Sequence, residues 1–281
     1  MTSDENFPCA KCHLYAKSDW GLSLQFSQIT FATMPAPCQC RCCYCAVNKE
    51  LPRGWEKNPD VLSGYEKIFD FLNFAKREKI ISPETRWLIA SGEITIHPFK
   101  KELMRLTKGN PVMFFTNGFI FDEDIAQELH ENPRALLNIS LDAGTAETWH
   151  KVKGANNFPK VVANLGRYGA ACVNPRQIIL KYIILPGVND SDADFLSFIE
   201  MEKSWNTSFG TISRDNNILS TVEVPSKIPP ARKVFNYDLI DSAARFTALR
   251  LKFLGSVSFS NFTAEEKRQT MILAEKLLPY L

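Results

Sequence analysis

The chain has 281 residues, 45% of them apolar and 23% charged, which is typical of a globular protein and excludes a disordered or fibrous chain. Its 33 basic and 31 acidic residues give a net charge of +2, so bulk charge provides no attraction to nucleic acid or to a membrane surface. The start of the sequence, MTSDENFPCAKC, has no apolar signal core, and the most apolar run, 178–185, is far shorter than a membrane span, so we expect a cytoplasmic protein.

Strand-like and helix-like segments alternate along most of the chain. Runs of β-branched and aromatic residues predict strands over 22–31, 86–90, 111–115, 135–141, 177–185 and 209–213. Apolar residues at helical spacing predict helices over 59–80, 99–107, 122–131, 147–152, 158–168 and 190–205. Such alternation implies a parallel sheet covered by helices, and about six units predict a partial TIM-type (β/α)6 barrel.

After residue 214 the alternation stops. Residues 222–231 contain three prolines and are predicted to form a loop, whereas 234–251 and 263–281 are predicted to be helices. Thr263 is placed to cap the last helix, with Glu265 and Glu266 in its first turn. We therefore predict an N-terminal segment (1–21), a core domain (22–214) and a C-terminal helical extension (215–281) that packs on the core.

Cysteine usage is the unusual feature of this composition. Of eight cysteines, five lie between residues 38 and 45, and only Cys172 follows Cys45. A disulfide-stabilised protein spreads its cysteines along the chain to close loops, so this distribution does not predict disulfides. Thiolates grouped this closely are typical of a soft metal ion or an iron–sulfur cluster in a reducing compartment.

Three of these cysteines have a specific spacing. Cys38, Cys42 and Cys45 form C-x3-C-x2-C, and three thiolates can hold three irons of a 4Fe–4S cluster while the fourth iron stays open to a small chelating ligand. A structural zinc site and a fortuitous cysteine-rich loop are the alternative interpretations.

The remaining cysteines of the first 45 residues allow a second metal site. Cys9 with Cys12, and Cys40 with Cys43, form two C-x2-C pairs, and four thiolates satisfy tetrahedral zinc. However, Cys43 directly follows Cys42, so two metal sites would be crowded, and the gap between the pairs is longer than in common zinc ribbons. Free thiols near the cluster are the alternative.

Polar residues follow several of the predicted strands. Glu93, Asn117, Asp142 and Asn189 each stand after a strand, as the cysteine segment does. Because the carboxyl ends of parallel strands share one edge of the sheet, we expect these positions to converge on one pocket.

The cysteine segment resembles the signature of the radical S-adenosylmethionine (SAM) enzymes. Tyr44 stands before the last cysteine and Arg41 before the second, as is common in that family. Ser91-Gly92-Glu93 is similar to the family's Gly-Gly-Glu segment, which binds the amino group of the methionine moiety. Here Ser91 replaces the first glycine, and Ile94 stands where proline is frequent.

Further segments between residues 25 and 213 extend this resemblance. Thr116-Asn117-Gly118 follows the third strand, as it often does in the family, and 138–154 is similar to the fourth-strand region of the peptide-modifying and cofactor-building branch. The resemblance implies that Ser140 or Asp142 contacts the ribose hydroxyls and that Lys181 pairs with the SAM carboxylate. From the residues alone, a helix-capping turn at 140–142 and a lysine at the sheet edge remain open.

The resemblance implies an enzyme with two cofactors, a 4Fe–4S cluster and SAM. The cluster would cleave SAM reductively to methionine and a 5′-deoxyadenosyl radical, which abstracts hydrogen from an unidentified substrate, namely a peptide, sugar or nucleotide. A one-electron reductant such as flavodoxin or ferredoxin is implied. The expected cluster ligands are Cys38, Cys42 and Cys45, and the expected SAM-binding residues are Tyr44, Ser91, Gly92, Glu93, Asn117, Ser140, Asp142 and Lys181. The alternative is a non-catalytic iron–sulfur or zinc-binding module for electron transfer or assembly.

Overall fold

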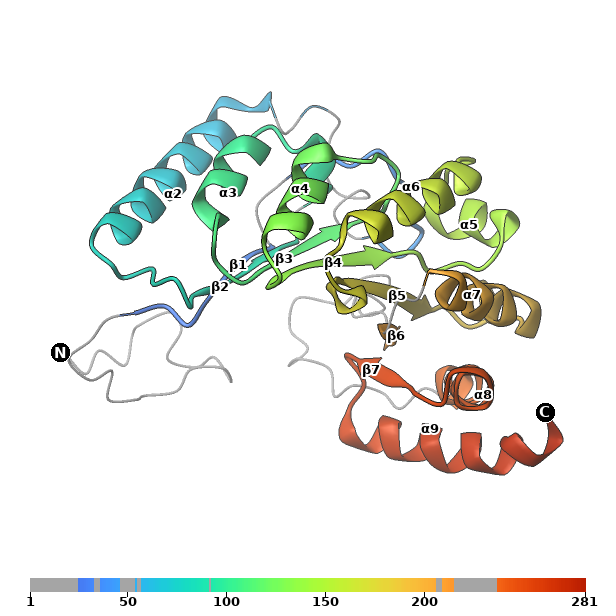
Figure 1. The fold of residues 1–281 in the computed structure, drawn as a ribbon. Helices are drawn as coiled ribbons and strands as arrows, with labels where there is room; N and C mark the ends of the chain where they lie inside the picture. The colour runs from blue at the N-terminus through green and yellow to red at the C-terminus, as the bar shows by residue number, and fades with distance from the viewer. Residues whose placement is uncertain are drawn as a thin grey trace, which may run out of the picture.

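The computed structural model describes residues 25–32, 36–45, 54, 57–90, 92–205, 209–214 and 237–281. In this part of the chain, parallel strands form one seven-stranded sheet whose spatial order equals the sequence order (Figure 1). The strands are β1 (Gln28–Phe31), β2 (Arg86–Ile89), β3 (Val112–Thr116), β4 (Ala135–Ser140), β5 (Ile178–Ile184), β6 (Phe209–Arg214) and β7 (Ser258–Ser260). Parallel neighbours need crossover connections, and helices supply them.

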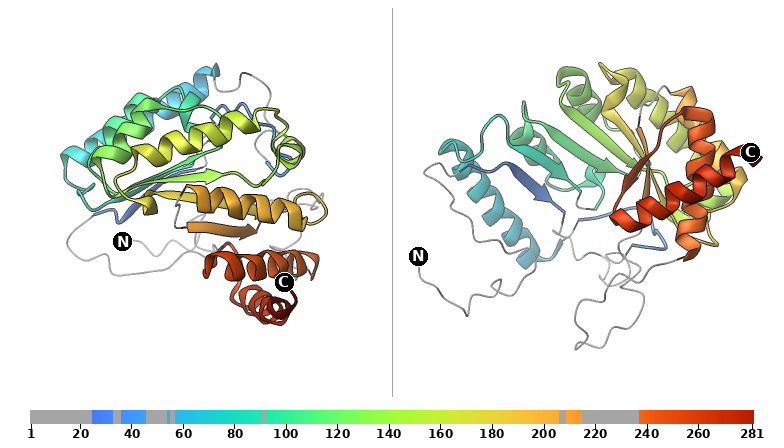
Figure 2. Two further views of the ribbon diagram at one scale, coloured as in Figure 1. Left: turned by 45° about the vertical axis from the view of Figure 1, so that its right-hand side comes forward. Right: turned by 90° about the horizontal axis from the view of Figure 1, so that it is seen from below.

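The helices lie along one face of the sheet, with the last two beside β7 (Figures 1 and 2). They are α2 (Pro59–Arg77), α3 (Lys100–Thr107), α4 (Glu123–Glu131), α5 (Ala146–Lys153), α6 (Phe158–Ala171), α7 (Asp192–Ser204), α8 (Tyr237–Leu254) and α9 (Ala264–Leu277), with short 3-10 turns at Ile94–Ile96, Pro175–Gln177 and Leu278–Tyr280. Side-chain caps begin several helices: Asp122 accepts from the Ile125 N–H at α4, and Thr263 accepts from the Glu266 N–H at α9.

Side chains alternate between the two faces of each strand. In β4, Leu137 and Ile139 are fully buried beneath the helices, whereas Asn138 and Ser140 lie half-buried on the opposite face. The apolar core therefore fills the layer between sheet and helices. The opposite, half-buried face carries both apolar and polar side chains, such as Phe115 and Asn138.

The structure confirms the predicted fold class, a partial barrel of parallel strands with helices at its C-terminal end. It adds β7, a three-residue strand that pairs with β6 in parallel and was not predicted. Ser258, Phe259 and Ser260 contain one apolar residue, too few for a recognisable strand pattern. Residues 1–21 and 215–236 lie outside the described residues, so the proposed domain boundaries stay predictions. None of the described helices is long and apolar enough to cross a membrane.

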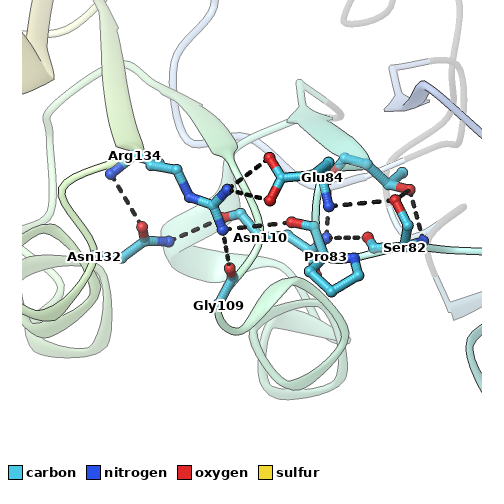
Figure 3. A network of polar contacts seen from close by, with 8 residues as sticks. Ser82, Pro83, Glu84, Gly109, Asn110, Asn132 and Arg134 are labelled. Carbon is cyan, nitrogen blue, oxygen red and sulfur yellow. Dashed lines mark hydrogen bonds and ion pairs between the residues drawn. The ribbon is translucent and has the colours of Figure 1, made fainter.

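A polar network connects the loops at the amino ends of β2, β3 and β4 (Figure 3). The Arg134 guanidinium donates to both carboxylate oxygens of Glu84, at 3.0 and 2.9 Å, and to the Gly109 carbonyl at 2.6 Å. Beside it, the Asn132 amide donates to the Asn110 carbonyl at 2.8 Å. These bonds satisfy loop carbonyls at the end of the sheet opposite the polar strand ends.

Candidate functional site

A cavity of about 490 Å³ opens at the carboxyl ends of the strands, a size suited to a small-molecule cofactor. Most of the predicted site residues line it: Cys38, Cys42, Tyr44, Cys45, Gly92, Glu93, Asn117, Ser140 and Lys181. Three polar residues that are not among the predicted site residues, Thr116, Lys153 and Asn261, line it as well. Ser91 lies outside the described residues.

The C-terminal end of α5 holds the cysteine segment in place. The Arg41 N–H donates to the Lys153 carbonyl and the Cys43 N–H to the Val152 carbonyl, both at 2.9 Å. Gly154 follows with φ +64°, and a Cβ there would stand 3.2 Å from the Arg41 Cβ and carbonyl oxygen. A glycine at this position therefore permits the close approach between helix end and loop.

A buried ion pair lies directly behind this contact. The Lys153 ammonium and the Asp142 carboxylate pair with no exposed side-chain surface. The Tyr44 hydroxyl donates to Asp142 Oδ2 at 2.6 Å and accepts from Lys153 Nζ at 2.8 Å. The Ile183 N–H donates to Asp142 Oδ1 at 2.7 Å. A buried charge pair is tolerated when its hydrogen bonds are satisfied in this way.

These contacts give Asp142 a different environment from the expected one. Both of its carboxylate oxygens already accept hydrogen bonds, and its side chain does not line the cavity. In this structure the Asp142 carboxylate therefore anchors Tyr44 and Lys153, and its role toward a ribose stays a prediction. Ser140 does line the cavity, and its neighbour across the β4–β5 ladder is Lys181, which lines the cavity too.

Cys42 and Lys153 lie close enough to shift each other's pKa. Burial raises the pKa of the Cys42 thiol, and the nearby Lys153 ammonium opposes this shift. Burial favours the neutral form of Lys153, but the charges of Asp142 and Cys42 hold the pKa of Lys153 above its usual range. Lys153 thus places a positive charge near the Cys42 sulfur.

Cys38 and Cys40 differ in character although they are two residues apart. A hydrogen bond from Cys40 lowers the pKa of the Cys38 thiol, and the same bond is the main cause that raises the pKa of Cys40. The two sulfurs therefore shift each other's pKa in opposite directions. Cys43 is exposed. The second metal site stays a prediction, because Cys9 and Cys12 lie outside the described residues.

Gly92 sets the distance between the end of β2 and the cysteine segment. It has φ +55°, and a Cβ there would stand 2.6 Å from both the Cβ and the carbonyl oxygen of Ala36. The next N–H, that of Glu93, donates to the Pro37 carbonyl at 2.9 Å. Only glycine allows both the left-handed conformation and the contact without displacing the backbone.

Glu93 is the buried carboxylate of the cavity and is 1% exposed. Its Oε1 accepts from the Thr116 hydroxyl at 2.7 Å and from the Thr95 hydroxyl at 3.0 Å. Its Oε2 accepts from the Asn117 N–H at 2.8 Å. Burial raises the pKa of this carboxyl, and these hydrogen bonds oppose the shift. A carboxylate oxygen can accept more than one bond, so Oε2 has capacity for an ammonium donor.

The chemistry of the donor set identifies the kind of group that the cavity can hold. No three His, Cys, Asp or Glu side chains in the described part of the chain are placed to hold a single metal ion. Cys38, Cys42 and Cys45 nevertheless line one cavity. Three thiols that line one open cavity fit a polynuclear cluster with one iron left for a small ligand.

Comparison with known proteins decides the family. Residues 37–199, more than half of the chain, match the family described as Radical SAM superfamily. The chain belongs to this superfamily. It is therefore an enzyme of a family that uses a 4Fe–4S cluster and SAM, and the alternative of a non-catalytic module is set aside.

Curated relatives of this radical SAM chain include enzymes named for GTP cyclisation. It is 26% identical over 179 residues to GTP 3′,8-cyclase of Microcystis aeruginosa, covering 61% of the chain and 52% of the relative. It is 26% identical over 170 residues to a probable GTP 3′,8-cyclase of Archaeoglobus fulgidus, covering 60% and 52%. The chain spans about half the length of these relatives.

Solved structures agree on the fold. Streptococcus suis SuiB bound to its precursor peptide SuiA aligns with a TM-score of 0.59 at 10% identity, covering 89% of this radical SAM chain and 52% of SuiB. SuiB bound to S-adenosylmethionine aligns with a TM-score of 0.54 at 11% identity, covering 87% and 49%. At these identities the likeness shows the shared fold of the sheet and its helices.

Proposed function

We propose that this protein cleaves SAM reductively and uses the product radical to take hydrogen from a separate substrate. The observation that carries the proposal is the convergence of Cys38, Cys42, Cys45 and Glu93 on one cavity. When bound, the reduced cluster supplies one electron to the sulfonium of SAM, which splits into methionine and a 5′-deoxyadenosyl radical that abstracts a hydrogen atom.

In this proposal the two ends of the methionine moiety meet opposite charges. Glu93 accepts from the ammonium group through Oε2, and the backbone at Gly92 approaches the same group. Lys181 pairs with the carboxylate, and its ladder neighbour Ser140 bonds a ribose hydroxyl. The backbone N–H of Asn117 holds Glu93 in its orientation. Fixing both ends keeps the sulfonium in register with the cluster.

Other residues shape the surroundings of the reaction. Tyr44 lines the cavity, and its hydroxyl is occupied by Asp142 and Lys153, so its ring covers the cavity wall without offering a free proton. A covered wall limits the access of water to a reactive radical. The electron is proposed to come from a one-electron reductant of the flavodoxin or ferredoxin class.

The test compares two adjacent cysteines. Anaerobically reconstituted protein, with SAM and dithionite, is expected to form 5′-deoxyadenosine and methionine. Cys42→Ala is expected to abolish both products, because it removes a cluster ligand. Cys43→Ala is the matched control, since this exposed neighbour is outside the ligand spacing, and it is expected to retain activity. Product formation by Cys42→Ala would contradict the ligand assignment.

The substrate class needs a second experiment. The curated relatives are named for GTP, whereas SuiB was solved with a precursor peptide, and this chain spans about half of each. Deuterated GTP, peptide and sugar candidates are offered in turn, and 5′-deoxyadenosine is analysed by mass spectrometry. Deuterium transfer identifies the substrate class, because the radical takes its hydrogen from the bound substrate.

A further inference from the structure

The side chain of Asn117 lies between the cavity carboxylate and a proposed cluster ligand. The Asn117 backbone N–H donates to Glu93, and its side-chain amide donates to the Cys38 sulfur at 3.6 Å. We propose that the Asn117 side chain acts on the cluster and not on SAM: its N–H···S bond to Cys38 raises the cluster's reduction potential. This inference rests on the proposed function, because it takes Cys38 as a cluster ligand.

The direction of the amide follows from its other contacts. Asn117 Oδ1 accepts from the Phe119 N–H at 2.9 Å and from the Gln39 amide at 3.3 Å. The Phe119 backbone N–H is a fixed donor and can be satisfied only by the carbonyl oxygen, so the NH2 group points the other way, toward Cys38. A flipped amide would place an N–H group against the Phe119 N–H and an oxygen against the Cys38 sulfur.

The donor is held rigidly and is shielded from water. Asn117 is 7% exposed, and it directly follows β3, whose last residue, Thr116, is also bonded to Glu93. Gln39 belongs to the cysteine segment itself and therefore couples the amide to the loop that carries the ligand. In a surrounding of low dielectric constant, a hydrogen bond to a charged acceptor is stronger than in water.

Such a bond favours the reduced form of a cluster. One-electron reduction increases the negative charge that the cluster shares with its thiolate sulfurs, so a donor at Cys38 stabilises the reduced state more than the oxidised state. Hydrogen bonds to the sulfurs are among the factors that set iron–sulfur potentials. Asn117 thereby makes the reduction that precedes SAM cleavage easier for a biological reductant.

The test is a redox titration in the absence of SAM. Wild type and Asn117→Leu are reconstituted anaerobically, and the reduced cluster is followed by electron paramagnetic resonance against applied potential. The variant is expected to shift the reduction equilibrium about tenfold toward the oxidised cluster, which is roughly 59 mV for one electron. Asn132→Leu is the matched control, an equally buried asparagine at the opposite end of the sheet, and its potential is expected to equal that of wild type.

The outcomes separate the inference from the proposed function. If wild type assembles no cluster of about four irons, the proposed function fails. If the cluster assembles and Asn117→Leu leaves its potential unchanged, the inference alone is overturned, and a loss of SAM affinity with unchanged potential would make the side chain a SAM ligand. Should Asn117→Leu not fold, Gln39→Leu decides: it removes an orienting donor and is expected to lower the potential less, and no shift overturns the inference.

Discussion

Lys153 and Tyr44 are 109 residues apart in the sequence, yet the Lys153 ammonium donates to the Tyr44 hydroxyl at 2.8 Å. Tyr44 lies between two cysteines of the proposed cluster site, whereas Lys153 ends α5. The bond therefore connects the ligand loop to the body of the sheet, through Asp142 at the end of β4. The position of the loop therefore depends on a charge pair whose side chains are fully buried.

Removal of the Tyr44 hydroxyl should loosen the ligand loop. Tyr44→Phe leaves Asp142 and Lys153 each short of one buried hydrogen bond, so we expect the free energy of unfolding to fall by about 1–3 kcal/mol and the iron content to drop. Urea denaturation and iron analysis after gel filtration measure the two effects. Tyr168→Phe is the control: it loses a buried hydroxyl bonded to the Asp122 N–H, away from the loop, and should keep its iron. Equal iron retention in both variants would rule out the anchoring role.

Removal of the Lys153 charge should lower the free energy of unfolding more than removal of the Tyr44 hydroxyl does. Lys153→Met leaves the Asp142 carboxylate buried without its counter-charge, and the expected loss is about 3–5 kcal/mol of unfolding free energy. Adding Asp142→Asn removes the uncompensated charge while an amide oxygen still accepts from the Ile183 N–H. The double variant should therefore be more stable than Lys153→Met alone. If the losses of unfolding free energy in the two single variants simply added up in the double variant, Lys153 and Asp142 would not be directly coupled.

A methyl group at Gly92 should disturb two segments at once. Gly92→Ala brings a Cβ to 2.6 Å from Ala36 and forces a left-handed alanine, so stability and cluster occupancy should both fall. Gly109→Ala is the matched control, because Gly109 has φ +80° but a Cβ there would meet no atom within 4 Å. It should show only the conformational cost of about 1–2 kcal/mol. The difference between the two unfolding free energies measures the close approach to Ala36.

Neutralising Glu93 should weaken the binding of SAM. Glu93→Gln removes the charge that is proposed to face the ammonium group, and we expect the dissociation constant to rise at least tenfold, about 1.4 kcal/mol. Isothermal titration calorimetry of the cluster-loaded protein measures the change. Glu128→Gln, a substitution of another buried glutamate in α4, should bind SAM as wild type does. An unchanged dissociation constant for SAM in Glu93→Gln would contradict the assignment of Glu93 as a SAM-binding residue.

His97 should make stability depend on pH. Burial lowers the pKa of His97 from 6.5 to about 4, and its ring accepts from the Phe99 N–H and contacts the Tyr65 hydroxyl. Between these two pKa values the unfolded chain binds a proton that the folded chain does not, so stability is full above pH 6.5 and falls as the pH drops toward 4. The loss is up to roughly 3 kcal/mol. His97→Asn keeps an acceptor for Phe99, and its denaturation midpoints should depend less on pH over this interval.

The parallel sheet and most of the cavity could be predicted from the sequence because their signals are local. Strand-end positions such as Glu93 and Asn117 follow clear apolar runs, and the carboxyl ends of parallel strands meet by topology. The three cysteines of the proposed cluster site also lie within one short segment, so their spacing is visible in the sequence. Other features depend on contacts between distant segments, and their sequence signals are weak or absent.

Lys153 illustrates this limit. In the sequence it is a basic residue in the last turn of a helix, which usually means a solvated side chain that complements the helix dipole. Only the docking of the cysteine segment on α5 buries it and pairs it with Asp142. For the same reason the pairing of Asp142 with Tyr44 and Lys153 could not be predicted, because neither partner is adjacent to it in the sequence. Asn261 and β7 escaped prediction because a three-residue strand leaves almost no periodicity.

The position of Asn261 has a consequence for how such an enzyme diversifies. Among the residues that the structure describes, every other one that lines the cavity lies between Ala32 and Ile183, and Asn261 comes from after β7. Substitution around β7 would thus change one wall of the cavity without changing the sequence of the cysteine segment. A laboratory that seeks new reactivity on this scaffold should begin its libraries at residues 258–262.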